Sequence, residues 1–398
     1  GANTTGGSNV AVGSYALDAN TTSSDNVAVG HHSLGTNITG TQNTAIGKGS
    51  LFSNTTSNNT AAGFEALNAN TTGTQNVAVG AGALDANTTA ANNTAVGYRA
   101  AYTQEGASAQ NTAVGMSALY TNNGGEYNTA LGYYSMQGAT TGDYNTAIGA
   151  STMVAANTGS YNNAVGYLAL TANTSGAQNN AVGAGSLDAN TTGSYNTAMG
   201  HDSLSANTTA SNNTAFGHSA LALNTTGDTN VSIGLNSLDA NTTGSANTAV
   251  GVHALGGNTT ADNNVAVGYN ALKANTTGTD NVGIGHNALT ANTTANDNTA
   301  VGDNALSTNA TTNSNTALGS GALATNVGSN NVGVGASALT ANTTANNNVA
   351  VGTNSLSGNT TGGSNTAVGH DALVANTTGA NNIGIGVSTL DANTTAHD

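Results

Sequence analysis

The 398-residue chain contains no cysteine, no proline and no tryptophan, and its only cationic side chains are Lys48, Arg99 and Lys273. Without cysteine, neither disulfides nor thiolate metal sites hold the structure together. The formal net charge is −15, so nucleic acid and anionic membrane surfaces are not expected as partners, because both attract clustered Lys and Arg. Membrane insertion is not expected either, because no apolar run approaches the roughly 18 residues of a membrane span.

A short repeat occupies the whole chain instead. Asparagine recurs twenty-three times at near-constant 17-residue spacing, from Asn9 to Asn382, and a glycine follows each time four residues later. A period this short cannot hold a helix pair or a propeller blade, so each copy is interpreted as one coil of a solenoid. The sequence predicts an all-β fold, a parallel β-solenoid (β-roll) with about 23 coils of 17 residues and two short strands per coil. We expect a single elongated repeat domain over residues 1–398, with irregular coils at about 98–167.

The repeat is described below with its asparagine as position 1. Position 4 is always apolar and position 9 is Leu in twenty copies, whereas positions 3 and 8 carry small residues. Because strand side chains alternate between faces, we expect positions 2 and 4 to point into the core and positions 3 and 5 to point away from it. The small residues then indicate close packing, either between the two sheets of a thin coil or between identical chains side by side.

The asparagine and glycine rows have a structural interpretation. Equivalent residues of stacked coils lie about 4.8 Å apart, a distance at which side-chain amides hydrogen-bond up the stack. A glycine in every coil indicates a bend with positive φ or a close backbone approach. The predicted structural ladder is represented by Asn9, Asn26, Asn43, Asn76, Asn264 and Asn382, and by Gly13, Gly30, Gly47, Gly268 and Gly386.

A second turn carries Asn-Thr-Thr or a close variant, which has three interpretations. Its amides and hydroxyls satisfy turn backbone, or it accepts N-linked glycans through the Asn-x-Thr pattern, or its threonines order water as an ice-binding surface. The candidate glycosylation sites are Asn20, Asn87, Asn207, Asn241, Asn275 and Asn376. The ice-binding hypothesis requires Thr-x-Thr on one flat face, whereas these threonines are adjacent.

Tyrosines gather where the repeat is least regular, between Tyr98 and Tyr167. Amphipathic rings are favoured at contact surfaces, so this stretch is the candidate ligand patch; the alternative is drift in a tolerant surface turn. The patch residues are Tyr120, Tyr127, Tyr133, Tyr134 and Tyr144.

Catalytic, cofactor and metal sites are not expected. His201 and His218 fall in consecutive coils, but most histidines lack a second ligand-type neighbour. Repeating turns without a cleft do not assemble a base, a nucleophile and an oxyanion site. The chain is therefore expected not to be an enzyme.

The segments Asn76-Val77-Ala78-Val79-Gly80 and Asn145-Thr146-Ala147-Ile148-Gly149 resemble the head repeats of trimeric autotransporter adhesins. The longer unit with Asn-Thr-Thr-Gly is similar to repeats of bacterial surface fibres and phage tail fibres. This resemblance covers essentially the whole chain and implies a parallel β-roll, often trimeric, at a cell surface or on a virion. The unit departs from the shorter, 14-residue unit of those adhesin heads.

The leading functional hypothesis is a structural component of an extracellular fibre, a rigid non-catalytic rod for reach, display or matrix. Its expected partner is the chain itself, stacked head to tail or associated laterally, with glycans as a second class of partner. The alternative is an adhesin or tail fibre that binds a host glycan or receptor, and an ice-binding protein is the third.

Overall fold

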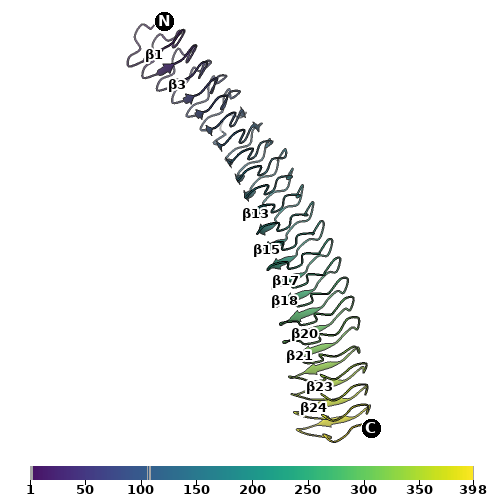
Figure 1. Cartoon of the computed structure of the whole chain (residues 1–398). Coiled ribbons are helices and arrows are strands. Elements are labelled where there is room, and N and C mark those ends of the chain that lie inside the picture. The colour runs from purple at the N-terminus through teal and green to yellow at the C-terminus, as the bar shows by residue number, and fades with distance from the viewer. Residues whose placement is uncertain (1–2, 105, 107–108, 398) are drawn as a thin grey trace. The chain divides into compact units, whose positions relative to one another are not determined.

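The computed structural model describes residues 3–104, 106 and 109–397, and no helix occurs among them. The chain divides into two compact units, Gly1–Asn196 and Thr197–Asp398, and each is an all-β parallel solenoid (Figure 1). The predicted fold class and coil length are therefore confirmed. The expectation of one repeat domain over 1–398 stays a prediction.

Each coil contributes one three-residue strand to a parallel sheet. In the N-terminal unit these strands are β1 (Val10–Val12), β2 (Val27–Val29), β3 (Thr44–Ile46), β4 (Thr60–Ala62), β5 (Val77–Val79), β6 (Thr94–Val96), β8 (Thr112–Val114), β10 (Thr129–Leu131), β11 (Thr146–Ile148), β12 (Asn163–Val165) and β13 (Asn180–Val182). In the C-terminal unit they are β14 (Thr197–Met199), β15 (Thr214–Phe216), β16 (Val231–Ile233), β17 (Thr248–Val250), β18 (Val265–Val267), β19 (Val282–Ile284), β20 (Thr299–Val301), β21 (Thr316–Leu318), β22 (Val332–Val334), β23 (Val349–Val351), β24 (Thr366–Val368) and β25 (Ile383–Ile385).

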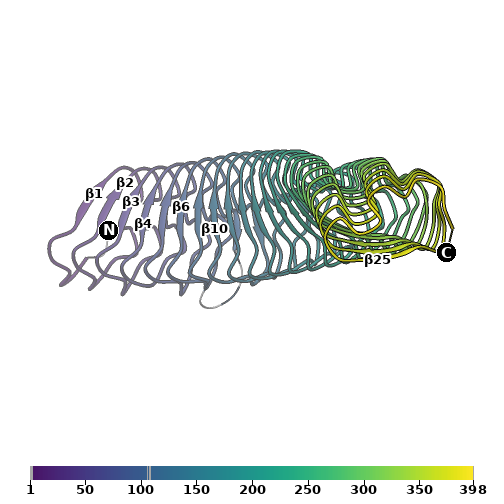
Figure 2. The same cartoon turned by 90° about the horizontal axis from the view of Figure 1, so that it is seen from below.

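The register of the sheet places every residue over its equivalent in the next coil. In β18 and β19, for example, Val265 pairs with Val282 and Val267 pairs with Ile284. Figure 2 shows the coils of the C-terminal unit nearly end-on, with successive traces lying over one another. A chemical property repeated every 17 residues therefore becomes a continuous row along each unit.

The expected second strand in every coil is wrong. In the described residues a second strand occurs only in two irregular coils, where β7 (Thr103–Gln104) pairs with β9 (Thr121–Asn122). Elsewhere positions 7 and 9 adopt left-handed conformations, with φ of 56° at Asn270 and 51° at Leu272, which are incompatible with an extended strand. The coils remain hydrogen-bonded through these turns, because the Leu272 amide donates to the Ala288 carbonyl at 2.9 Å.

The predicted orientation of the strand is also wrong. The alanines at position 3, from Ala28 onward, are 0% exposed, whereas position 4 faces solvent, with Ile284 38% and Leu318 43% exposed. Alternation explains the result: the position-1 asparagine points inward, so position 3 follows it and positions 2 and 4 point outward. The interior is too narrow for a branched residue at position 3, since a Cβ added to Gly283 would lie 3.2 Å from Leu272 Cγ. The core therefore consists of Leu at position 9 with small residues at positions 3 and 8.

Two buried asparagine ladders line this core, the predicted one at position 1 and a second in the Asn-Thr-Thr turn at position 12. In the position-1 ladder the Asn281 backbone amide donates to Asn264 Oδ1 at 3.0 Å, and Asn264 Nδ2 donates to the Gly278 carbonyl at 2.8 Å. In the position-12 ladder Asn275 Nδ2 donates to Asn258 Oδ1 at 2.9 Å. The ladder residues named from the sequence take part as expected: Asn9, Asn26, Asn43, Asn76, Asn264 and Asn382.

The glycine at position 5 satisfies both conditions expected of it. Gly13, Gly30, Gly47, Gly268 and Gly386 have φ between 126° and 137°, a region that is essentially restricted to glycine. A Cβ on Gly268 would also lie 2.5 Å from the Gly285 carbonyl oxygen of the next coil. This row therefore allows coils to approach closely at the end of each strand.

Replacing one glycine of this row should strongly destabilise the fold. We expect Gly268→Ala to cost about 3 kcal/mol, because a disallowed φ and a backbone clash act together. The matched control is Gly321→Ala in the same unit: Gly321 has φ of 66° and only Ser337 Oγ near its added Cβ, at 3.9 Å. Other coils place non-glycine residues at this position, so the control should cost only about 1–2 kcal/mol. Urea unfolding midpoints followed by circular dichroism test this, and equal losses would contradict it.

Breaking the position-1 ladder should also be costly. Asn264→Ala leaves the buried amide of Asn281 without its side-chain acceptor and removes one of the two side-chain donors to the Gly278 carbonyl. We therefore expect a loss of about 2–4 kcal/mol. Asn123→Ala serves as control, because Asn123 is an exposed turn residue, and it should change stability by less than about 0.5 kcal/mol. Thermal and urea unfolding of both variants give the comparison. A ladder variant as stable as the control would show that the stacked amides contribute little.

Candidate binding site

The structure separates the five tyrosines of the predicted patch into three groups. Tyr127 and Tyr144 occupy position 17 of adjacent coils and stack at 4.8 Å between ring centroids. Tyr133 and Tyr134 lie side by side in the turn after a strand, with centroids 4.0 Å apart. Tyr120 stacks on Tyr102 at position 10. The tyrosines thus lie at three places round the coil, and at two of them they stack between adjacent coils.

The longest of these ladders is the one at position 17. Tyr161 continues the stack above Tyr144, with centroids 5.1 Å apart and planes 5° from parallel. The pKa of Tyr144 is raised, first by partial removal of its hydroxyl from water and then by Tyr127 and Tyr161 on either side. In the next coil Gln178 takes the tyrosine's place, and Tyr195 follows in the coil after that.

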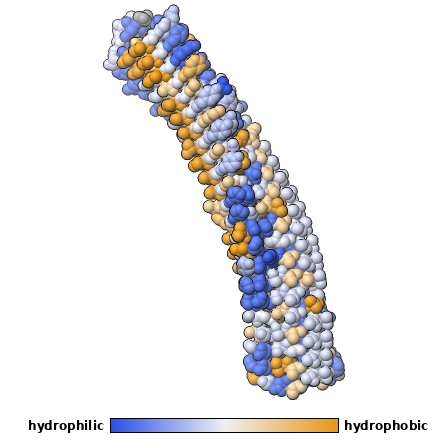
Figure 3. Space-filling view, in the orientation of Figure 1, coloured by the Kyte–Doolittle hydropathy of each residue, from blue (hydrophilic) through white to orange (hydrophobic). Residues whose placement is uncertain are grey.

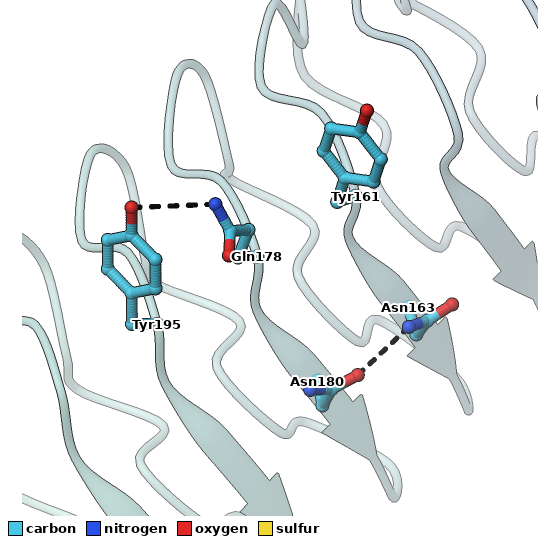
Figure 4. A pocket seen from close by; sticks show the side chains of 5 residues that line it. All are labelled: Tyr161, Asn163, Gln178, Asn180 and Tyr195. Atoms are coloured by element: carbon cyan, nitrogen blue, oxygen red, sulfur yellow. Dashed lines mark hydrogen bonds between the residues drawn. The ribbon is translucent and has the colours of Figure 1, made fainter.

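An open hollow of about 510 Å³ lies where the ladder is interrupted. It is lined by Tyr161, Asn163, Gln178, Asn180 and Tyr195, and Figure 4 shows Gln178 between the two tyrosines with the two asparagines beside them on adjacent strands. Asn163 Nδ2 donates to Asn180 Oδ1 at 2.9 Å, and Gln178 Nε2 donates to Tyr195 Oη at 3.4 Å. We call these five residues the ladder gap.

Sequence reasoning missed the ladder gap, although a signal was present. Position 2 is Val, Thr or Ile in every coil except two, and those two carry Asn163 and Asn180. Both asparagines are exposed, so no packing requirement accounts for the change. Two successive asparagines in an outward row of Val, Thr and Ile, with Tyr161 and Gln178 two residues earlier, form the pattern that identifies this site.

A second, smaller cluster surrounds Asp85. Arg99 lies over the rings of Tyr98 and Tyr102, at 5.3 and 5.4 Å from their centroids. Burial raises the pKa of Asp85, and the nearby Glu65 raises it further, while a hydrogen bond from Tyr102 and the charge of Arg99 act in the opposite direction. The negative charge of the Asp85 carboxylate is in turn the main reason that the pKa of Tyr102 is raised.

The candidate glycosylation sites lie in the position-12 ladder. Asn20, Asn87, Asn207, Asn241, Asn275 and Asn376 are at most 1% exposed. Their Nδ2 atoms donate to backbone carbonyls of their own turn, as from Asn275 to Gly278 at 2.9 Å. A sugar joined to Nδ2 would break these bonds and would have no space, so the folded coils are incompatible with N-glycans at these asparagines. The Asn-Thr-Thr pattern there serves the backbone.

The threonines of the same turn are divided between two roles. The first threonine donates its hydroxyl to the next coil, as Thr276 does to the Thr293 carbonyl at 3.0 Å. The second, such as Thr277, is exposed. One hydroxyl of each pair is thus engaged with backbone and only the other row faces solvent.

Three of the histidines lie beside acidic residues. His201, His286 and His370 each have a carboxylate within 2.8–3.0 Å, and His201 also stacks on His218 at 5.2 Å. Within residues 3–104, 106 and 109–397, no three His, Asp or Glu side chains gather at a spacing suited to a metal ion. The same part of the chain contains no helix of the length and apolarity needed to cross a bilayer.

Comparison with protein-family models and with curated proteins finds no match to this chain.

The raised pKa of Asp85 predicts a pH-dependent effect of Asp85→Asn. Because burial disfavours the carboxylate, the wild-type protein loses stability as pH rises through the raised pKa, and the variant lacks this loss. We therefore expect Asp85→Asn to be more stable than wild type at pH 7, with the difference disappearing near pH 3. Unfolding midpoints at the two pH values measure it. Glu65→Gln removes the second cause and should shrink the difference; a difference independent of pH would contradict the assignment.

Proposed function

We propose that this chain is a structural, non-catalytic component of an extracellular fibre, in which copies of the chain associate laterally through their strand faces. One observation supports this above all: the outward row at position 4 is apolar in every coil. We call this row the apolar stripe; it runs from Val12 to Val182 in the N-terminal unit and from Met199 to Ile385 in the C-terminal unit. Figure 3 shows apolar side chains following one another along the strand side of the N-terminal unit.

The stripe has the character of a contact surface. Its side chains are partly or largely exposed, as at Val79 (39%) and Ile233 (41%), and monomeric proteins rarely leave such a continuous apolar surface uncovered. The residues of positions 2 and 4 include no charge in any coil, although the chain carries 18 acidic residues. The acidic residues that the structure describes all lie outside the strands. Lateral association therefore brings two uncharged faces together and leaves the negative charges outside.

The dimensions of the stripe suit a second copy of the chain. The stripe spans eleven coils in the N-terminal unit and twelve in the C-terminal unit. At about 4.8 Å per coil each stripe is roughly 55 Å long, and a three-residue strand about 10 Å long gives it an area of roughly 500 Å². The two units together offer roughly 1,000 Å² per chain, compared with about 800 Å² per partner in a stable complex. A second copy also repeats at the same spacing, so its side chains interdigitate with the stripe in every coil.

The resemblance to adhesin heads and tail fibres favours the same assembly and a surface location. It also keeps adhesion to a glycan or receptor as a second candidate function, which the exposed tyrosine ladders favour. Ice binding is third, since the exposed strand face mixes threonine with side chains as large as Phe216 and Met199 and is uneven as a result.

Cationic substitutions on the apolar stripe should separate the copies. In Val250→Lys/Val267→Lys/Ile284→Lys, each new ammonium group must be desolvated in the contact, so we expect monomers where the wild-type chain forms oligomers. The control Thr260→Lys/Thr277→Lys/Thr294→Lys adds the same charge in the same coils at exposed turn positions and should remain oligomeric. Sedimentation velocity gives the oligomeric state, and circular dichroism confirms the fold. A wild-type chain that stays monomeric at about 100 μM would refute lateral association.

A further inference from the structure

We propose that the ladder gap is a binding site for a neutral polysaccharide, occupied by one pyranose ring between Tyr161 and Tyr195. This inference specifies a ligand for the second candidate function, adhesion, and is independent of lateral association. The chemistry of the five lining residues carries it, beginning with the two rings.

The rings offer two faces across the interruption. Tyr161 is covered on one side by Tyr144, and its other side is directed toward Gln178 in the next coil. Tyr195 lies two coils from Tyr161, a separation of about 10 Å at the spacing of parallel strands. A pyranose ring is a few ångströms thick, and its axial C–H groups carry partial positive charge that suits the negative face of an aromatic ring. One sugar therefore fits between the rings once the Gln178 side chain swings aside.

Gln178 is held weakly enough to move. Gln178 is an exposed residue, and the one hydrogen bond that its side chain makes within the described chain, to Tyr195 Oη, is 3.4 Å long. The replacement of tyrosine by glutamine thus opens a space in the ladder without rebuilding the backbone, because Tyr161, Gln178 and Tyr195 have φ of 62°, 58° and 61°. The position accepts either side chain in the same conformation.

The two asparagines supply polar recognition beside the rings. Asn163 and Asn180 lie two residues after Tyr161 and Gln178, and all four side chains are exposed and line the same hollow. After their mutual bond, the exposed pair keeps Asn163 Oδ1 as an acceptor and the Asn180 Nδ2 hydrogens as donors, and Gln178 lines the same hollow. Acceptors and a donor side by side match sugar hydroxyls, each of which both donates and accepts.

The electrostatics of the site select a neutral sugar. None of the five lining residues is charged, and the chain as a whole is strongly acidic with three cations. A sialylated, sulfated or uronate-rich glycan would meet repulsion here without an Arg or Lys to compensate. The site is open at its solvent side, so a residue within a long chain enters as readily as a chain end.

Affinity gel electrophoresis tests the proposal with the full chain, which migrates because of its negative charge. Native gels contain a neutral glucan, mannan, galactan or xylan, or the acidic polymer alginate. We expect at least one neutral polysaccharide to retard the wild-type protein. Gln178→Tyr completes the tyrosine ladder and fills the gap, so its Kd should be at least about fivefold weaker.

Two further variants separate binding from folding. Gln75→Tyr makes the same substitution at position 17 of a coil without flanking tyrosines, at a similar φ of 59°, and should migrate as wild type. Asn163→Thr/Asn180→Thr restores the residue common at position 2 and should weaken binding while preserving the fold. Retardation by alginate alone, by no polymer, or equally in wild type and Gln178→Tyr would overturn the proposal. Because none of these variants alters position 4, failure here leaves lateral association intact.

Discussion

Every row of this structure depends on one constraint: each side chain lies about 4.8 Å from a copy of its own kind in the next coil. Amides tolerate this best, because one amide both donates and accepts, and the two asparagine ladders use that property in the interior. Hydroxyls, stacked rings and apolar groups also tolerate it. Like charges do not, which explains why only 5% of residues are charged and why acidic residues seldom occupy one position in successive coils. The composition follows from the stacking.

The interior is fixed more strictly than the surface because the coil is thin. Leu272 fills the space opposite the strand, and a Cβ at position 3 already contacts it, so that row is restricted to Ala, Ser or Gly. The larger apolar residues of the strand therefore have no room inside. In most β-proteins an outward row of valines would promote aggregation. Here the row faces outward because one leucine row and two amide ladders already fill the core.

The sequence was sufficient for the period, the parallel stack, the ladder of Asn264 and its equivalents, and the role of Gly268. It misled at the strand because position 4 looked like a core position by hydropathy alone. The buried amide at position 1 indicates the correct orientation of the strand, because alternation then places position 3 inside and position 4 outside. The left-handed conformation of Leu272 had no signal, because leucine rarely adopts it and only the stacked coil enforces it. The ladder gap was not predicted because the tyrosine pattern alone does not include Asn163 and Asn180, the two unusual residues at position 2.

The two proposed surfaces are compatible because they occupy different rows of one face. The apolar stripe lies at position 4, and the ladder gap lies at positions 17 and 2. A partner seated on Val165 and Val182 would therefore lie beside Asn163 and Asn180 and would leave Tyr161 and Tyr195 at the edge of the contact. Lateral association would then set several ladder gaps side by side. A polysaccharide is itself a repeating chain, so weak single contacts add through effective concentration, and binding to the assembly exceeds binding to one copy without any new contact. The two proposed functions, reach and adhesion, would thus have a common physical origin in the repeated coil.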